Sequence, residues 1–345
     1  MRFEPSSIMR FLSRLAAFLS LQLLVAAVVI WQGSPQDSNH YLSALQDKIE
    51  RLEQRPGNRL LVVGGSNVAF GIHSQRLQES TGLETVNLGL HASLGLEFAL
   101  ECARRHCHAG DIVLLSPEYE LLISDVQQGD PITINQLLAQ WPEAAWYIDQ
   151  ERGTGWKRFL DHDALWRTHE WVSRAYARIT RRKKEGRIYE RSSFNECGDV
   201  VAHYDRPTPA AIGTGPLAKI DPKRLEQAIE ILKQFSRECA DRGVAVYLSY
   251  PPMPEEKYAA SIDVIRQVTR TLETELEIPV LHAPDKFVFP LDDFFDSSYH
   301  LTRAAGDRRS RDIGDAVQRH QHPTGIAARH EAEETAAILP VEIRR

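Results

Sequence analysis

The chain has 345 residues, of which 43% are hydrophobic and 26% are charged, and its formal net charge is −6. This composition is typical of a globular protein and excludes a collagen-like chain, a disordered tail protein and a multi-pass membrane protein. The mildly acidic balance argues against a nucleic-acid-binding protein, which usually carries a basic face.

An apolar stretch of about 20 residues, the thickness of a bilayer core, covers residues 11–31. Arginines lie at and before its start, so the positive-inside rule keeps the N-terminus in the cytoplasm and translocates the rest. A cleaved signal peptide is the alternative, but the stretch ends in Val29, Ile30 and Trp31 rather than in small residues. We therefore expect residues 1–32 to be a cytoplasmic stub and a single-pass transmembrane anchor in the cytoplasmic membrane, with an extracytoplasmic, periplasmic domain.

Residues 33–57 are polar with a short helical pattern, and we expect a stalk that leads into a domain at 58–319. Five apolar segments in that domain are short and rich in β-branched residues. They cover residues 60–63, 85–88, 111–115, 244–248 and 279–281. Apolar strands that alternate with helices predict an α/β fold with three layers, α/β/α, and a five-stranded, mainly parallel sheet.

A long insertion, about residues 121–220, separates the third and fourth strands and holds five of the tryptophans. Its sequence is helix-like, and we expect a helical cap over the carboxyl edge of the sheet. The last residues, 320–345, are polar and irregular, which predicts a loose tail.

The four cysteines stand at positions 102, 107, 197 and 239 and lack the spacing of a zinc site. They are best interpreted as small buried side chains. One disulfide is possible if the domain is exported, and the sequence does not choose the pair.

The segment Gly64-Gly65-Ser66-Asn67 follows the first strand directly and opens a helix. Ligands bind at the carboxyl ends of strands in open α/β sheets. The free N–H groups of a helix N-terminus can hold an oxyanion there. The segment does not match a dinucleotide loop, a phosphate loop or a G-x-S-x-G elbow. On this segment alone, a helix-capping role for Ser66 is as good an interpretation as nucleophilic catalysis.

A second segment, with Asp296 and His300, follows the last strand. A serine hydroxyl needs a general base, and an imidazole base needs a carboxylate to orient it. Loops after parallel strands open at the same edge of the sheet, so His300 can meet Ser66. We predict a catalytic triad of Ser66, His300 and Asp296, with Asp293 as the acid if Asp296 does not reach the histidine.

Together these blocks resemble the SGNH/GDSL hydrolase-like superfamily over about residues 58–318. They are most similar to its membrane-anchored extracytoplasmic branch, which includes alginate O-acetylation and teichoic-acid D-alanylation proteins. The resemblance implies a flavodoxin-like fold, Ser66 as the nucleophile, and a backbone N–H of Gly89 as an oxyanion donor.

Two further blocks leave alternatives open. The family usually has an asparagine donor after the third strand, where this chain has Glu118, and an ionised carboxylate cannot donate. Either Glu118 is protonated, or Asn67 or Asn195 donates instead, or Glu118 has another task. Asn195 and Asp199 either orient substrate or form a turn with Asx hydrogen bonds.

The predicted function is that of a serine esterase or O-acyltransferase acting through an acyl-serine. From the resemblance, we expect an acyl-ester or cell-envelope polysaccharide substrate and a membrane-bound O-acyltransferase as a partner, with no metal, no cofactor and no nucleic acid. The alternative is a non-catalytic SGNH-like scaffold, or polymer-binding subunit, of an envelope acylation complex.

Overall fold

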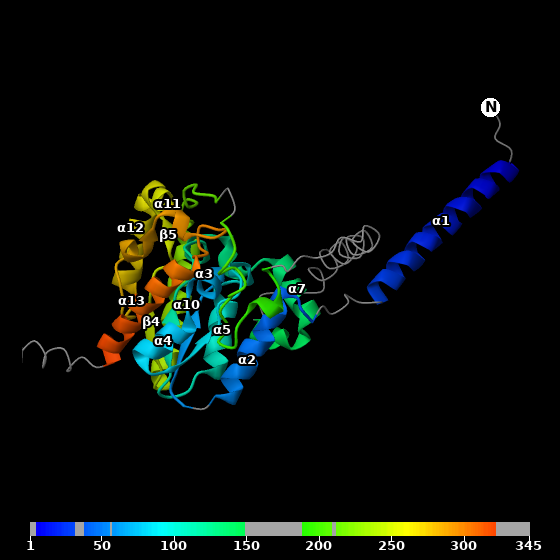
Figure 1. Cartoon of the computed structure of the whole chain (residues 1–345). Coiled ribbons are helices and arrows are strands. Elements are labelled where there is room, and N and C mark those ends of the chain that lie inside the picture. The colour runs from blue at the N-terminus through cyan, green and yellow to red at the C-terminus, as the bar shows by residue number, and fades with distance from the viewer. Residues whose placement is uncertain (1–4, 32–37, 56, 149–187, 209–211, 322–345) are drawn as a thin grey trace, which may run out of the picture.

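The centre of the fold is a parallel β-sheet of four short apolar strands (Figure 1). They are β1 (Arg59–Val63), β2 (Glu84–Asn87), β3 (Ile112–Leu115) and β4 (Ala245–Leu248), in the order β2-β1-β3-β4. Leu61 of β1 pairs with Val86 on one side and with Val113 on the other. The computed structural model describes residues 5–31, 38–55, 57–148, 188–208 and 212–321.

The predicted fifth strand is wrong. At residues 279–281 the structure has one parallel bridge, between Leu248 and Val280. Pro279 has no N–H to donate, and Pro284 begins a 3-10 turn shortly afterwards, so the pairing does not extend. Instead, β5 (Met253–Pro254) pairs with β6 (Val288–Phe289) in a separate two-stranded parallel sheet.

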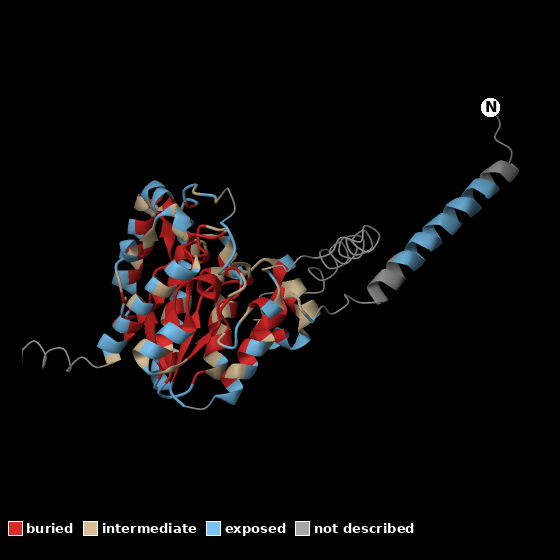
Figure 2. Ribbon diagram, in the orientation of Figure 1, coloured by how far each residue is buried: buried red, intermediate tan, exposed pale blue. Residues whose placement is uncertain are grey.

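Helices cover both faces of the main sheet (Figures 1 and 2). The α-helices of the described residues are α1 (Pro5–Trp31), α2 (Ala44–Gln54), α3 (Ser66–Gly71), α4 (Ser74–Thr81), α5 (Leu96–His106), α6 (Glu120–Ile123), α7 (Pro131–Gln140), α10 (Pro222–Asp241), α11 (Glu255–Ala260), α12 (Ile262–Glu275) and α13 (Arg303–Gln321). The described 3-10 helices are η1 (Tyr41–Ser43), η2 (Ala92–Leu94), η3 (Asp125–Gln128), η4 (Pro142–Tyr147), η6 (Arg191–Ser193), η7 (Pro284–Phe287) and η8 (Leu291–Asp293).

Alternate residues of each strand enter opposite cores, as the two-residue period of a strand requires. Leu61 and Val63 pack with α2, α5, α10 and α12, whereas Leu60 and Val62 pack with α4 and α13. Both faces of the sheet are therefore buried, which explains the uninterrupted apolar strands. The predicted α/β class with a mostly parallel sheet is confirmed.

The predicted stalk is wrong for the part of it that the structure describes. The residues of the helical pattern, Tyr41, Leu45, Ile49 and Leu52, are all buried in the main core. The ammonium group of Lys48 donates to the carbonyl oxygen of Asn87 at 2.8 Å and to that of Gly198 at 2.5 Å. Residues 41–54 are thus part of the domain, because their apolar stripe has the domain itself as its partner.

Helix α1 spans the predicted anchor, and its side chains from Met9 to Val25 are exposed wherever they are large and apolar (Figure 2). Of the residues described, no helix combines the length and the mean hydropathy needed to cross a membrane. Arg10, Ser13 and Arg14 lower the hydropathy of the described part. The side chains of residues 26–31, the most apolar end of the predicted anchor, lie outside the described residues.

The insertion begins with α6, η3, α7 and η4, so its described part is helical up to residue 148. Residues 149–187, with Trp156, Trp166 and Trp171, lie outside the described residues, as do residues 322–345 of the predicted tail. The end of the insertion returns to the sheet, where the carbonyl oxygen of Cys197 accepts the N–H of Asn87 at 2.9 Å. This contact places Cys197 at the carboxyl end of β2.

Candidate functional site

Asp296 and His300 form a hydrogen-bonded pair in the loop before α13. Nδ1 of His300 lies 2.7 Å from Oδ1 of Asp296. The loop closes on itself through a hydrogen bond of 2.8 Å from the N–H of Phe295 to the carbonyl oxygen of His300. A carboxylate at Nδ1 keeps the proton there and leaves Nε2 as the basic nitrogen. The predicted replacement acid, Asp293, lies 2.5 Å from Arg308 instead.

Tyr189, which the sequence analysis missed, completes this pair. Its phenol donates to Oδ2 of Asp296 at 2.7 Å and lies 3.4 Å from Nδ1 of His300. Burial raises the pKa of Asp296, but the hydrogen bonds from His300 and Tyr189 outweigh it and leave that pKa below its usual value. Burial and the bond to Asp296 raise the pKa of Tyr189, so the phenol stays protonated and donates. The carboxylate is therefore held at both oxygens.

Ser66 is the first residue of α3 and is half-buried. Among the described residues its hydroxyl has no hydrogen-bond partner. As the first helical residue, its N–H has no acceptor within the helix. A Cβ on Gly65 would lie 2.5 Å from a carboxylate oxygen of Glu118 and 2.8 Å from Cα of Ala92. The glycines before Ser66 are needed because three loops converge tightly around the start of α3.

The structure brings Phe70, which follows Ser66 on the same helix, to the imidazole of His300. Phe70 lies one turn after Ser66, and residues four apart share a helix face. The rings of Phe70 and His300 are stacked, with centroids 4.0 Å apart and an angle of 8° between their planes. No hydrogen bond joins Ser66 to His300 within the described residues, and such contacts often tighten only when substrate binds.

Glu118 holds the serine loop in place rather than donating to an oxyanion. Its two carboxylate oxygens accept the N–H of Gly65 at 3.0 Å and the N–H of Asn67 at 2.9 Å. Burial raises the pKa of Glu118 above its usual value, and the hydrogen bonds from Asn67 offset only part of this shift. Both carboxylate oxygens accept hydrogen bonds from backbone N–H groups. The prediction that Glu118 replaces the family's asparagine as an oxyanion donor is therefore wrong.

Asn67 is also unavailable as an oxyanion donor, because it is fully buried and bonded. Its Nδ2 donates to the carbonyl oxygen of Ser116 at 2.8 Å, and its Oδ1 accepts from Arg309 at 3.1 Å. The guanidinium of Arg309 also donates to the hydroxyl of Ser116 at 2.8 Å. Burial lowers the pKa of Arg309, and the charge of Glu118 opposes this shift. These contacts tie α13 to the loop that carries Ser66.

The predicted role of Gly89 as an oxyanion donor is wrong as well. Its N–H donates to Oδ1 of Asn87 at 2.9 Å. A Cβ at this position would lie 2.5 Å from Cβ of Val68 and 2.6 Å from the backbone nitrogen of Ala69. Gly89 therefore lets the loop after β2 approach α3.

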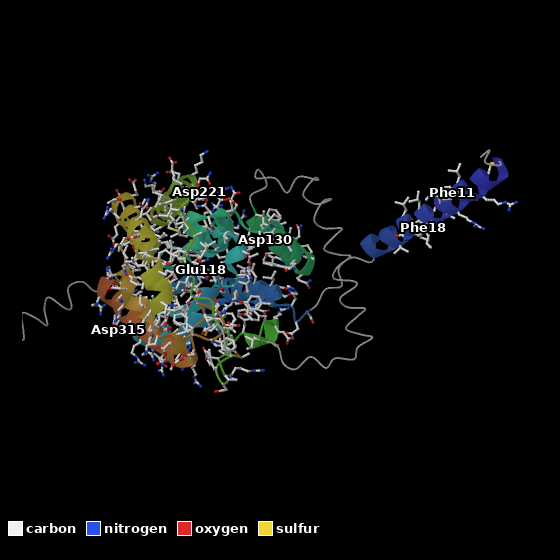
Figure 3. The ribbon with its side chains drawn as sticks, turned by 90° about the horizontal axis from the view of Figure 1, so that it is seen from above. Phe11, Phe18, Glu118, Asp130, Asp221 and Asp315 are labelled. Carbon is white, nitrogen blue, oxygen red and sulfur yellow. The ribbon has the colours of Figure 1, made fainter. Side chains whose placement is uncertain are left out.

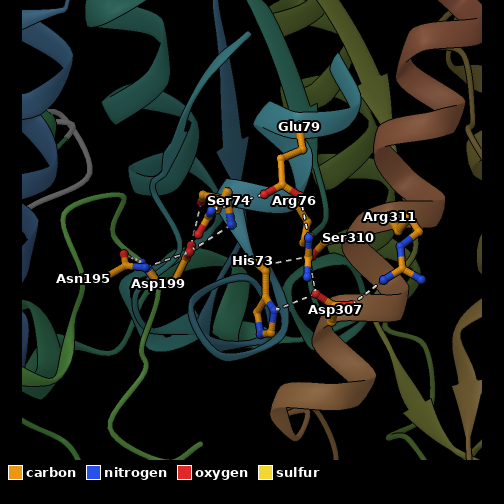
Figure 4. A network of polar contacts seen from close by, with 10 residues as sticks. His73, Ser74, Arg76, Glu79, Asn195, Asp199, Asp307, Ser310 and Arg311 are labelled. Atoms are coloured by element: carbon orange, nitrogen blue, oxygen red, sulfur yellow. Dashed lines mark hydrogen bonds and ion pairs between the residues drawn. The ribbon is translucent and has the colours of Figure 1, made fainter. Parts of the chain in front are cut away.

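Asn195 and Asp199 form the turn that the sequence analysis offered as the second alternative (Figure 4). Oδ1 of Asn195 accepts the N–H groups of Cys197 and Asp199 at 3.0 and 2.9 Å. The carboxylate of Asp199 accepts from both the N–H and the hydroxyl of Ser74, at 2.9 and 2.6 Å, and from Asn87 at 2.8 Å. These bonds fasten the end of the insertion to α4 and β2.

A second imidazole, His91, lies in the loop after Gly89 and was not predicted. Its Nδ1 accepts the N–H of Ser93 at 3.1 Å, so the neutral ring carries its proton on Nε2. His91 is an exposed residue, but partial desolvation of its ring and then the charge of His300 lower its pKa, which favours the neutral ring. The next residue, Ala92, is the one that packs against Gly65. His91 thus offers an N–H donor next to the start of α3.

No protein-family model matches this chain, and no curated protein matches it. The described residues hold no cluster of three or more histidine, cysteine, aspartate or glutamate side chains that could bind a metal ion.

Proposed function

We propose that this chain is a serine esterase or O-acyltransferase of the flavodoxin-like SGNH type. The observation that carries the proposal is the His300–Asp296 pair, hydrogen-bonded at 2.7 Å and stacked on Phe70, one helical turn from Ser66. Nucleophilic acyl transfer requires a serine hydroxyl and a base that a carboxylate orients, and the proposal assigns these roles to Ser66, His300 and Asp296.

In the proposed reaction, Oγ of Ser66 attacks the ester carbonyl carbon while Nε2 of His300 takes the hydroxyl proton. The tetrahedral intermediate collapses, the alcohol leaves with that proton, and an acyl-serine remains. Water, or a hydroxyl of a polymer, then attacks the acyl-serine with His300 again as the base. The first acceptor makes the chain an esterase and the second makes it an O-acyltransferase.

Two groups are proposed as oxyanion donors, and of these only His91 replaces Gly89 and Glu118, because the N–H of Ser66 was expected to donate together with Gly89. The first is the N–H of Ser66, which has no acceptor in its own helix. The second is Nε2–H of His91, whose other ring nitrogen is bonded to Ser93. Donors of this kind stabilise the negative charge that develops on the carbonyl oxygen.

We further propose that residues 11–31 anchor the chain in the cytoplasmic membrane, with the α/β domain outside it. The sequence supports this placement through the apolar stretch, the arginines before it and Trp31 at its end. The SGNH resemblance supports an envelope polysaccharide as the substrate and a membrane-bound O-acyltransferase as the partner.

The proposal is tested with the full chain in detergent and a fluorophosphonate probe, which labels activated serines. We expect labelling of the wild type and of Ser93→Ala, a nearby serine outside the triad. We expect no labelling of Ser66→Ala and strongly slowed labelling of His300→Ala. Labelling that persists in Ser66→Ala would refute Ser66 as the nucleophile.

A non-catalytic scaffold is the second candidate, because the residues at the two positions where the family has oxyanion donors are engaged elsewhere. The N–H of Gly89 is bonded to Asn87, and the carboxylate of Glu118 accepts rather than donates. For the scaffold we expect no labelling of a folded wild-type chain, together with retained binding of polysaccharide.

A further inference from the structure

A polar cleft of about 730 Å³ lies beside the start of α13. Residues of α4, of the end of the insertion and of the start of α13 line it, and most of them are polar. Ligand-binding clefts have volumes of about 300–1,000 Å³, so this one is large enough to hold a ligand. Helix α13 leads away from the reaction centre: Figure 3 shows Asp315 of α13 at the side of the domain and Glu118 near its centre.

An ion pair and hydrogen bonds hold one part of the cleft lining in place (Figure 4). Oδ1 of Asp307 on α13 accepts from Nε of Arg76 on α4 at 2.5 Å. Oδ1 of Asp199, from the insertion, accepts from the hydroxyl of Ser74 on α4 at 2.6 Å. These contacts join the three segments that line the cleft, so its shape exists before a ligand binds. Such preorganisation lowers the cost of binding.

Three other side chains of the cleft keep their hydrogen-bonding groups free. Among the residues described, the hydroxyls of Tyr204 and Thr302 have no hydrogen-bond partner, and the guanidinium of Arg303 has no carboxylate at ion-pair distance. Cζ of Arg303 lies 5.4 Å from the centroid of the Tyr204 ring, so two of these groups stand together. All three side chains can donate, and a ligand that satisfies them carries several oxygen acceptors.

The side chains that line the cleft carry no net formal charge. Arg76 and Arg303 contribute two positive charges, and Asp199 and Asp307 contribute two negative charges. Burial lowers the pKa of His73, which also lines the cleft, so its ring is neutral at pH 7. The balance of charge favours an uncharged ligand over a phosphate or a polyanion. Hydroxyl groups, which accept and donate, match this lining.

The cleft adjoins the proposed reaction centre. Thr302 follows His300 by two residues, so their Cα atoms are at most about 7 Å apart. The ring of Tyr204 packs edge-on against that of His203, with centroids 4.9 Å apart. His203 in turn packs on Phe70 at 5.1 Å, and Phe70 is the residue that stacks on His300. A chain molecule that reacts at the triad can therefore extend into the cleft.

We propose that this cleft binds an uncharged sugar unit of the polymer, next to the unit whose ester reacts at Ser66. The guanidinium of Arg303 and the hydroxyls of Tyr204 and Thr302 donate to the hydroxyl and ring oxygens of that sugar. The inference rests on the proposed function for the reacting ester, whereas the binding of sugar is measured without it.

Binding is measured by ligand-observed NMR titration of the full chain in detergent, with Ser66→Ala so that no ester is cleaved. The probes are β-1,4-linked hexasaccharides of glucose, mannose, xylose and N-acetylglucosamine. We expect at least one of them to bind, and Arg303→Ala or Tyr204→Phe to weaken its binding roughly 5- to 10-fold. Gln234→Ala is the matched control, because Gln234 lines a different cleft, between α5 and α10. A galacturonate hexamer is the charged comparison and should bind more weakly than the best neutral sugar.

The outcomes separate this inference from the proposed reaction. If the sugar binds and needs Arg303 and Tyr204, but the fluorophosphonate probe does not label the wild type, the cleft is a sugar site and acyl transfer is wrong. If the probe labels Ser66 but none of the four neutral sugars binds, the inference about the cleft is overturned. Binding that both substitutions leave unchanged, or tighter binding of the galacturonate hexamer, also overturns it.

Discussion

The phenol of Tyr189 gives the sharpest test of the proposed site, because Tyr189→Phe removes one oxygen atom and keeps the ring. The hydrogen bond to Asp296 is 2.7 Å long and has a charged acceptor. Bonds of this kind contribute about 1.5–3 kcal/mol. Tyr189 is 46% exposed, so water replaces part of the bond and about 1–1.5 kcal/mol remains. With the acid less firmly oriented, we expect kcat/KM to fall roughly 5- to 12-fold, mostly in kcat.

The assay is hydrolysis of p-nitrophenyl acetate by the full chain, with kcat and KM determined separately. Tyr147→Phe is the matched control, because its phenol is bonded to Nε2 of His106 at 2.8 Å, away from the triad. We expect the control to keep wild-type kinetics. If Tyr189→Phe also does so, or if it changes only KM, Tyr189 does not position the acid and the account of the Asp296 carboxylate fails.

Two further predictions concern stability, measured by urea unfolding. Burial lowers the pKa of Lys48 to about 7, so between pH 7 and its ordinary pKa of 10.5 the unfolded chain binds more protons. The free energy of unfolding of the wild type, relative to that of Lys48→Met, should therefore rise with pH in that window by up to about 1.4 kcal/mol per pH unit. If the difference between the two chains stays constant from pH 7 to pH 9, the lowered pKa is contradicted. Gly89→Ala should destabilise the fold by about 1–3 kcal/mol because its Cβ meets Val68 at 2.5 Å. Gly213→Ala, with nothing within 4 Å of its Cβ, is the control, and equal effects of the two changes would refute the close-approach argument.

The parts of the fold that were predicted correctly are those that a short stretch of sequence is enough to indicate. The apolar runs of β1 to β4 predict strands that are buried on both faces, and this prediction does not require knowing which strands or helices pack against them. The stalk was mispredicted because its stripe of Leu45 and Leu52 shows a buried face but not what buries it. The fifth strand failed for a local reason that the sequence did contain, since Pro279 cannot donate to a ladder.

The residues of the candidate site also divide into those that local sequence predicts and those that it does not. Asp296 and His300 were predictable because they share one loop, and they are hydrogen-bonded. Tyr189 was not predictable, because its role depends on a hydrogen bond to Asp296, which is 107 positions away in the sequence, and no motif surrounds it. The hydrogen bond that occupies the N–H of Gly89 could have been predicted from the sequence. The side chain of an asparagine often accepts the N–H of the residue two positions later, as Asn87 does here.

The way residues 38–54 pack against the domain limits how far the proposed active site can lie from the membrane. His40 pairs with Glu190, the neighbour of Tyr189, so the chain enters the domain beside the acid of the triad. Under the proposed anchorage, the seven residue steps from Trp31 to Ser38 extend at most about 25 Å. The reaction centre then works only on groups presented within a few nanometres of the bilayer surface, such as a donor handed over by a membrane enzyme or the membrane-proximal part of a growing polymer.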